Sequence, residues 1–298
     1  MTERIVLIGG SNIDYIAKSS KKLIERDSNI GKLSISFGGV GRNIVENLAR
    51  IGNRVSFFTS IGNDELGQTM KKHLLKLGVR VYSPEFEGTS SSYLSIHDSD
   101  GKMKCAVCDE RANDKLNIDF ISRNDSDITK AEYVCLDTNV LSKTISDLFQ
   151  RYPNKKWIVE AVSKNKVGRI RQYLNQIYLF KGNQYEAQAV IDSDTIDVST
   201  NIKRIIKLGT KNVIISNGKH AVYYGNKDGV FKIDITPLSQ IVNDTGAGDA
   251  MFAGIVDQIN VGQNIRNAII FGNQLARETL KTSNAVSSEI DKYKYNHE

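Results

Sequence analysis

Short apolar segments alternate with helical segments through the second half of the chain, and this alternation limits the possible folds more than any other feature. Four segments are expected to be buried strands, at 133–137, 156–161, 177–180 and 212–216. Strands separated by helices form a parallel sheet with helices on both faces. The sequence therefore predicts an α/β fold with a mostly parallel central sheet.

The first half of the chain has the same pattern, interrupted by two polar regions. Two buried strands and two helices are expected, over 4–10, 54–61, 43–51 and 64–77. Residues 33–37 and 91–108 instead alternate between polar and apolar side chains, which is typical of half-exposed antiparallel strands. We expect a single domain over residues 1–298, with these strands forming a small β lid.

The composition argues against two classes of partner. The net charge is +6, but Lys and Arg are spread along the chain without a cluster interleaved with aromatic residues, so we expect no nucleic-acid partner. No apolar run approaches a membrane span, and the first residues carry no signal-peptide pattern, so we expect no membrane partner. Three cysteines cannot all pair with one another, which fits a reducing compartment and a cytoplasmic protein.

The strongest local signal is the run DTGAGDAMFAG at residues 244–254. A helix is expected to begin near Gly246, and its free N–H groups and positive dipole end form a site for an anion. Gly246 and Gly248 let a phosphate approach the backbone. Asp249 lies beside that site, where a carboxylate can take the proton of an attacking hydroxyl group. The alternative is a glycine-rich turn with an acidic residue placed favourably against the dipole.

Two further segments indicate a site for a polyhydroxyl ligand. Residues 38–43 (GGVGRN) look like a dinucleotide fingerprint, but Ile44 stands in place of the third glycine, which disfavours an NAD-dependent oxidoreductase. Glycine residues without side chains, followed by Asn43, better suit close packing of the backbone against the hydroxyl groups of a ligand. Asn12 and Asp14 follow the first strand, where ligands gather in open parallel sheets. A polar turn is the alternative for these two residues.

Two other patterns are set aside. Residues 62–69 have the glycine spacing of a P-loop, but Gln68 replaces the required lysine. Cys105 and Cys108 lack a second ligand pair at metal spacing, and in a strand their thiols point to opposite faces. We therefore expect neither a P-loop nor a metal bound by these cysteines.

Taken together, these motifs resemble the PfkB-type, or ribokinase-like, carbohydrate kinases. The resemblance spans nearly the whole chain, with motifs in the expected order at 10–14, 38–43, 61–67, 181–186 and 244–249. It implies a three-layer α/β/α fold and an ATP-dependent transfer of a phosphoryl group to a sugar hydroxyl. A non-catalytic sugar or nucleotide sensor with the same fold is the alternative of a different class. An intact Asp249 argues against it, because a sensor needs no base.

The resemblance also implies a role for each motif residue. Asp249 is expected to be the base, beside an anion hole made by Gly246, Ala247 and Gly248. The sugar is expected to contact Asn12, Asp14, Gly39 and Asn43. ATP is expected to contact Thr245, Ser216, Gly218 and, near the adenine, Asn273. Mg²⁺ and the phosphates are expected near Asn183 and Glu186, although Glu186 could instead be an ordinary charge on an exposed helix.

Within the family, residues 38–52 look most like those of pseudouridine kinases, which implies phosphorylation of the 5′-hydroxyl of pseudouridine. On the same grounds, Asp137 and Asn139 are candidate substrate residues. Another nucleoside or a free sugar, such as adenosine, ribose or fructose, is the alternative acceptor.

The chain also departs from the family pattern. Glu160 and Ala161 stand where relatives carry an Asp-Pro pair. Asn243 stands where relatives often carry an aspartate that binds a monovalent cation, which speaks against potassium activation unless Asp244 substitutes. The lid strands are expected to pair across a two-fold axis in a homodimer, as in relatives.

Overall fold

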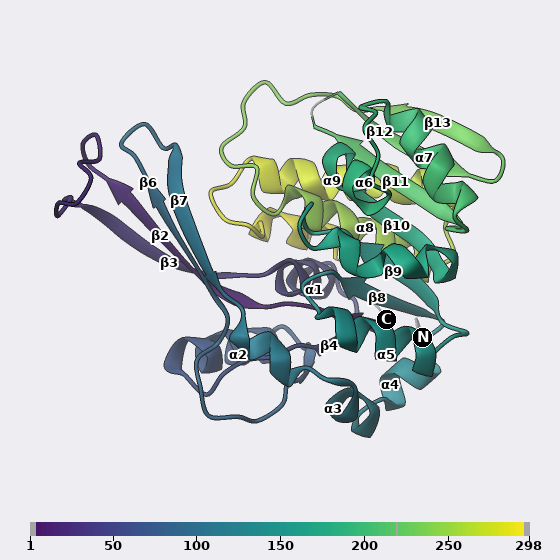
Figure 1. The fold of residues 1–298 in the computed structure, drawn as a ribbon, viewed down its shortest axis with the longest axis horizontal. Coiled ribbons are helices and arrows are strands. Elements are labelled where there is room, and N and C mark those ends of the chain that lie inside the picture. Colours follow the sequence, from purple (N-terminus) through teal and green to yellow (C-terminus); the bar gives the residue numbers. More distant parts are fainter. Residues whose placement is uncertain (1–3, 219, 295–298) are drawn as a thin grey trace.

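Nine strands form the central sheet of the computed structural model, which describes residues 4–218 and 220–294 (Figure 1). Their order is β13 (Gly229–Asp234), β12 (Ala221–Asn226), β11 (Asn212–Asn217), β10 (Ile177–Asn183), β9 (Lys156–Glu160), β8 (Tyr133–Asp137), β1 (Ile5–Ile8), β4 (Val55–Phe58) and β5 (Arg80–Tyr82). Neighbours from β11 to β5 are parallel, whereas β12 and β13 pair antiparallel. The predicted mostly parallel sheet is confirmed.

Helices cover both faces because the central strands are apolar on both sides. In β1, Val6 and Ile8 face one hydrophobic core, while Ile5 and Leu7 face the other. The first core is closed by α5 (Ser142–Arg151), η2 (Val167–Gln176), α6 (Gln184–Val190) and α7 (Val198–Lys207). The second is closed by α1 (Val40–Arg50), α8 (Ala247–Asn260) and α9 (Ile265–Leu280). This is the three-layer α/β/α fold that the resemblance implied.

The remaining helical elements lie at the edges of these layers. They are α2 (Glu65–Lys76), η1 (Arg111–Lys115), α3 (Ile118–Arg123), α4 (Ser126–Lys130) and η3 (Ser288–Tyr293). Within 4–218 and 220–294, no helix has both the length and the hydropathy that crossing a membrane requires.

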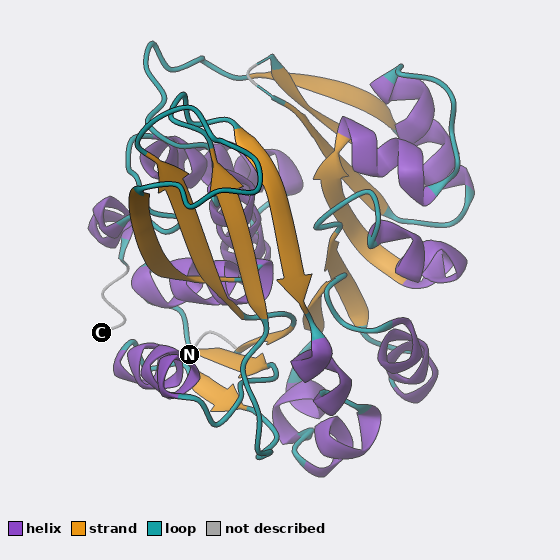
Figure 2. Cartoon of the chain, turned by 60° about the vertical axis from the view of Figure 1, so that its left-hand side comes forward, coloured by secondary structure: helices purple, strands orange, loops and turns teal. Residues whose placement is uncertain are grey.

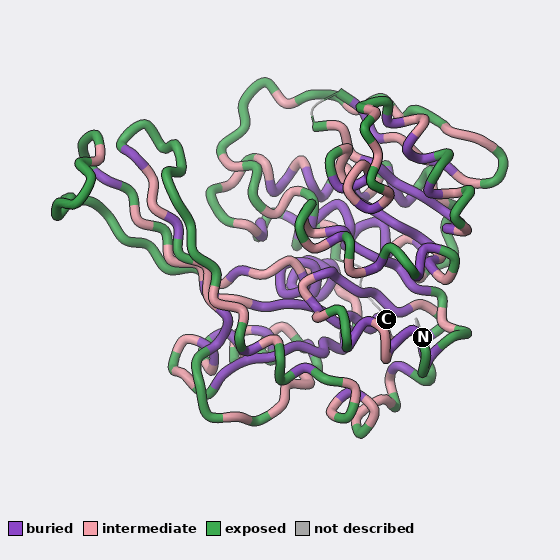
Figure 3. The backbone as a smooth tube through the Cα atoms, viewed as in Figure 1, coloured by how far each residue is buried: buried purple, intermediate pink, exposed green. Residues whose placement is uncertain are grey.

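A second sheet of four strands projects from this body as a lid (Figures 1 and 2). Its order is β3 (Gly31–Gly38), β2 (Asn12–Ser19), β6 (Ser92–His97) and β7 (Met103–Asp109). The sequence predicted the lid strands near 33–37 and 91–108 but missed β2. β2 has no continuous apolar run, and the outer part of the lid is largely exposed (Figure 3), so the strand carries little hydrophobic signal.

The base of the lid lies at the carboxyl ends of the central strands. β1 ends at Ile8 and β2 begins at Asn12, so residues 9–11 join the two sheets directly. α1 begins two residues after β3, which brings the lid, the first strand and a core helix to one point. In open parallel sheets this edge is where ligands bind.

Candidate active site

The first turn of α8 is shaped by a glycine that no other residue can replace. Gly246 caps the helix with φ 81°, a left-handed conformation that side chains rarely adopt. A Cβ atom at this position would lie 2.0 Å from the carbonyl oxygen of Ala285. The loop can therefore turn into the helix only without a side chain at residue 246. The start of a helix offers N–H groups to an anion, although here the N–H of Ala247 donates to the carbonyl of Asp244 at 3.3 Å.

Asp249 lies buried in this first turn and contacts α1. Asn43 Nδ2 donates a hydrogen bond of 2.7 Å to Asp249 Oδ2, across 206 residues of sequence. Burial raises the pKa of Asp249, while the Asn43 hydrogen bond and the charges of Lys181 and Arg42 oppose that rise. The result is a buried carboxylate held in one orientation, as a general base requires.

Arg42 fixes the orientation of Asn43, and sequence reasoning did not identify this function. Its guanidinium donates to Asn43 Oδ1 and to the carbonyl of Phe37, and it forms a buried ion pair of 2.7 Å with Glu46. Since Asn43 Oδ1 accepts from Arg42, its Nδ2 must face Asp249. Arg42 therefore sets the direction of the amide that contacts the candidate base.

A cavity of about 490 Å³, here called the lid cavity, lies between the lid and the carboxyl ends of the strands. Eight of the predicted site residues line it: Asn12, Asp14, Gly39, Asn43, Asn139, Thr245, Gly246 and Asp249. Asn12 Nδ2 donates to Asp14, and burial raises the pKa of Asp14 to about 6. Thr245, which we expected at the nucleotide, lines this cavity.

Asp137 does not line the lid cavity but supports its floor. The side chain is fully buried, and its carboxylate accepts the N–H of Gly10 at 2.9 Å and of Asn139 at 2.8 Å. Burial raises its pKa to about 6. Asp137 thus ties the end of β8 to the loop after β1, and a direct substrate contact stays a prediction.

Two charged residues at the cavity wall, Glu110 and Lys166, were not predicted. Lys166 Nζ donates to Asn139 Oδ1 at 2.7 Å and forms an ion pair with Glu110, which directly follows lid strand β7. The pair therefore connects the lid to the core. Nearby Val162 also lines the cavity with φ 62°, an unfavourable conformation for a β-branched residue, and such strain clusters at functional sites.

A second cavity of about 390 Å³, here called the helix cavity, lies on the other side of the first turn of α8. Among the predicted residues, Ser216, Gly218, Asn273, Ala247 and Gly248 line it. The other lining residues are mainly apolar and come from β12, α8, α9 and residues 235–241. Such a wall suits a flat aromatic ring held by apolar contacts, with a few polar groups that orient the ring.

Asn183 and Glu186 form the start of α6 next to the helix cavity. Asn183 pairs in register with Ser216 across β10 and β11. Its side chain accepts the N–H of Glu186 at 3.0 Å, and Glu186 Oε2 accepts the N–H of Asn183 at 2.7 Å, which completes a capping box. Glu186 is buried, so the alternative of an ordinary charge on an exposed helix is wrong.

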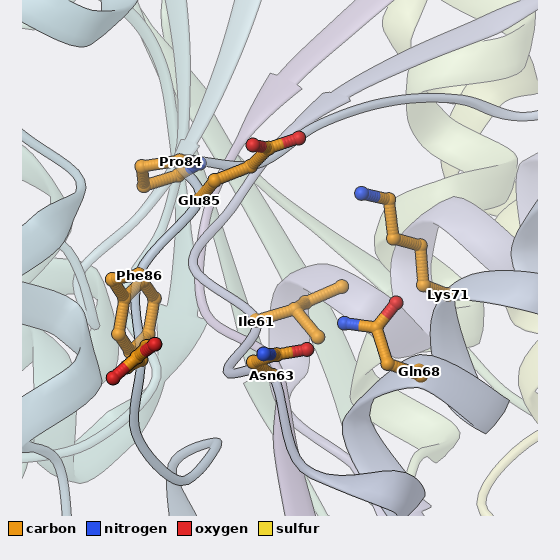
Figure 4. A pocket seen from close by; sticks show the side chains of 8 residues that line it. Ile61, Asn63, Gln68, Lys71, Pro84, Glu85 and Phe86 are labelled. Carbon is orange, nitrogen blue, oxygen red and sulfur yellow. The ribbon is translucent and has the colours of Figure 1, made fainter.

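A third cavity, of about 460 Å³, lies apart from these residues, between α2 and residues 84–87 (Figure 4). None of the predicted site residues lines it. It includes Asn63 and Gln68 of the segment with P-loop spacing. The N-terminus of α2 is capped from within, because Asp64 accepts the N–H of Gly67 at 2.9 Å.

Comparison with known proteins identifies the family. Residues 2–292 match the pfkB family carbohydrate kinases. The pseudouridine kinase of Escherichia coli (strain K12) is 31% identical over 274 residues, which cover 89% of this chain and 87% of that protein.

Solved structures show the same fold. A ribokinase from Thermotoga maritima superposes with a TM-score of 0.87 at 21% identity, covering 97% of this chain and 98% of that one. A ribokinase of Arabidopsis thaliana, complexed with ribose and ATP, gives a TM-score of 0.82 at 18% identity over 99% of this chain and 100% of that one. The chain therefore belongs to the pfkB family of carbohydrate kinases, ATP-using phosphotransferases that act on an alcohol group.

Proposed function

We propose that this enzyme phosphorylates the 5′-hydroxyl of pseudouridine, with ATP as donor and Asp249 as the general base. The observation that carries the catalytic part is the Asn43–Asp249 contact of 2.7 Å, at a turn that borders both cavities. The choice of pseudouridine rests on the 31% identity to the pseudouridine kinase of E. coli.

In this proposal the acceptor nucleoside occupies the lid cavity and ATP the helix cavity. Asp249 takes the proton of the acceptor hydroxyl while that oxygen forms a bond to the γ-phosphorus. The bond from the γ-phosphorus to the bridging oxygen breaks, and its electrons leave with ADP. The N–H groups of Gly246 and Gly248 stabilise charge on the phosphoryl oxygens during transfer.

The residues near α6 fit Mg²⁺ bound mainly through the ATP phosphates. Mg²⁺ prefers oxygen ligands and is usually held by one or two carboxylates together with phosphates and water. Glu186 offers a buried carboxylate beside Gly182, and Asn183, the register partner of Ser216, orients it through the capping box. Bound there, Mg²⁺ supplies positive charge to the phosphates.

The residues near Asn243 do not fit a monovalent cation. Asn243 Nδ2 donates to the carbonyl of Ser283 at 3.0 Å, while its Oδ1 accepts the N–H of Thr245 at 3.1 Å. A cation needs oxygen ligands, whereas this amide directs a donor at the carbonyl oxygen. Asp244, the possible substitute, lines the helix cavity. We infer that the amide joins the two loops without an ion.

We also propose a homodimer formed through the lid. Strand register aligns Tyr15, Ile35, Leu94 and Val107 on the lid face away from Asp14 and Tyr93. Three of these side chains are exposed, Ile35 by 49%, Leu94 by 39% and Val107 by 65%. A second copy of the lid would cover this apolar face. Light scattering should give twice 33.2 kDa, and a monomer mass would contradict the proposal.

The cytoplasmic assignment continues to rest on the cysteine count.

The test of function is a panel of acceptors assayed by ADP release with Mg·ATP. The panel contains pseudouridine, uridine, cytidine, adenosine, ribose and fructose at matched concentrations. We expect the highest kcat/KM for pseudouridine, whose extra ring N–H can bond an acceptor such as Asn139 at the cavity wall. A tenfold preference for ribose or adenosine would reject pseudouridine and keep the kinase. ATP binding without turnover of any acceptor would favour a sensor.

A further inference from the structure

A buried ion pair lies next to the candidate base, at the ends of two neighbouring strands. Lys181 Nζ is 2.8 Å from Glu160 Oε2, and the two side chains are only 4% and 6% exposed. The two residues are partners in the parallel register of β10 and β9. They follow Leu179 and Ile158, which face the core under α8, so the pair lies on that side of the sheet.

Stability alone does not explain this pair. Replacing a buried ion pair by apolar residues of similar size is often neutral or stabilising, because desolvation costs about as much as the attraction gains. In the other central strands of the sheet, the residues that follow the apolar run are small or neutral, except for Asp137 in β8. The carboxylate of Asp137 binds backbone N–H groups. Glu160 and Lys181 therefore point to a function that needs charge.

The Lys181 ammonium faces the first turn of α8. Its Nζ lies 3.5 Å from the position that a Cβ atom of Gly248 would occupy. Because Gly248 has no side chain, the ammonium group lies next to the backbone of the helix. A cation at the positive end of a helix is unfavourable unless an anion binds at the same place. In a kinase of this family the transferring phosphoryl group is such an anion.

The polar and charged groups around Asp249 come from four elements. Asn43 and Arg42 belong to α1, Lys181 to β10, Glu186 to α6 and Glu160 to β9. Three carboxyl groups are thus gathered with two cations, of which Arg42 is paired with Glu46 and Lys181 with Glu160. Lys181 is the cation from the sheet that favours the ionised form of Asp249.

We propose that Lys181 is a positioning residue of the phosphoryl-transfer site, where its charge keeps Asp249 ionised and adds to the attraction for the phosphates, while Glu160 holds it in place. This inference rests on the proposed function, since it assumes that Asp249 is the base.

The sign of the effect follows from the chemistry of a base. Asp249 accepts a proton only as a carboxylate, so kcat/KM falls as pH drops through its pKa. Burial already raises that pKa, and Lys181 opposes the rise. Removing the Lys181 charge therefore moves the acidic limb of the profile to higher pH.

The experiment compares Glu160→Gln with the double variant Glu160→Gln/Lys181→Met. The single variant keeps the lysine and a hydrogen-bond partner for it, while the double variant removes the lysine without leaving a buried, unpaired carboxylate. We expect the acidic limb of kcat/KM to lie about one pH unit higher in the double variant. We also expect its KM for ATP to be severalfold higher, measured with the best acceptor of the panel.

Controls separate this inference from the proposed function. Glu160→Gln/Lys181→Gln repeats the comparison with a polar neutral side chain, should the methionine variant fail to fold. Folded variants that share one acidic limb and one KM for ATP would overturn the role of Lys181. If Asp249→Asn keeps its turnover, the proposed function fails instead, whatever the lysine does.

Discussion

The lid cavity and the helix cavity meet at the same turn of α8 but differ in their walls. Amides, carboxylates and hydroxyls from both the lid and the core line the lid cavity, whereas mainly apolar side chains of β12, α8, α9 and residues 235–241 line the helix cavity. Directional hydrogen bonds distinguish one hydroxyl compound from another, while apolar contact holds any flat ring of suitable size. Under the proposed assignment of the two cavities, acceptor choice and ATP binding should therefore depend on separate residues.

The largest expected effect comes from the residue between the two cavities. Asp249→Asn should lower kcat by about 10²- to 10⁴-fold, the usual contribution of a general base, because the amide cannot accept the proton. Affinity for ATP should remain, since Asp249 lines the lid cavity only. Turnover by ADP release and ATP binding by calorimetry check the two halves. Near-normal kinetics would remove Asp249 from the mechanism.

A smaller loss is expected on the lid side. Asn43→Ala should cost roughly 1–3 kcal/mol, or about 5- to 150-fold in kcat/KM for the acceptor, because buried partners lose a hydrogen bond. ATP affinity should stay unchanged. Ser216→Ala serves as the matched control, because Ser216 lines the helix cavity and makes only a 3.4 Å bond to Gly182. If Asn43→Ala instead lost ATP affinity and used the acceptor normally, the assignment of ATP and acceptor to the two cavities would have to be exchanged.

The acidity of Asp14 provides a third way to distinguish the cavities. Burial raises its pKa to about 6, so below about pH 6 it becomes protonated and loses its capacity as a charged acceptor. KM for the acceptor should then rise severalfold as pH falls through this value, while KM for ATP changes little. Asp14→Asn should remove this pH dependence of KM. An equal rise in both constants would contradict the separation.

On the helix side the expected effect is smaller. Asn273→Ala should weaken ATP binding by about 0.5–1.5 kcal/mol, or roughly twofold to twelvefold, the usual contribution of one hydrogen bond. Acceptor KM should not change, because Asn273 lines the helix cavity alone. Calorimetry with ATP and acceptor kinetics would test both statements. A change confined to the acceptor would show that adenine does not lie near α9.

The smallest expected effect is that of potassium. Because the Asn243 amide already bonds Ser283, replacing Na⁺ by K⁺ should leave turnover and melting temperature unchanged. Asn243→Asp restores a carboxylate and should introduce sensitivity to K⁺. Strong activation of the natural protein by K⁺ would contradict the inferred role of the amide.

The sequence predicted the parts of this molecule whose signal is local. Continuous apolar runs identified β1, β4, β8, β9, β10 and β11 but not β5, β12 or β13 at the sheet edges. Glycine-rich turns identified the loops at residues 38–43 and 244–249. β2 was missed because a lid strand with few buried side chains has no such run. Continuous apolar runs in the sequence therefore predict the strands of the central sheet better than those of the lid.

The parts of the site that were missed depend on contacts between distant segments. Glu110 and Lys166 meet across 56 residues, and no spacing rule connects them. Glu160 and Lys181 carried a signal that went unused, namely a charged residue at the end of an otherwise apolar strand. Asp137 also stands at the end of an apolar strand, yet its carboxylate binds backbone N–H groups. The pattern alone therefore does not distinguish a residue that stabilises the fold from one that takes part in the reaction.

The central claim is that the acceptor hydroxyl lies in the lid cavity against Asp249, with the phosphates on the other side of the turn. A crystal structure with pseudouridine and a non-hydrolysable ATP analogue tests it directly. We expect the 5′-oxygen at about 2.6–3.2 Å from an Asp249 carboxylate oxygen, and the γ-phosphate at the N–H groups of residues 246–248. A nucleoside bound in the helix cavity, or a 5′-oxygen out of hydrogen-bond reach of Asp249, would contradict the account.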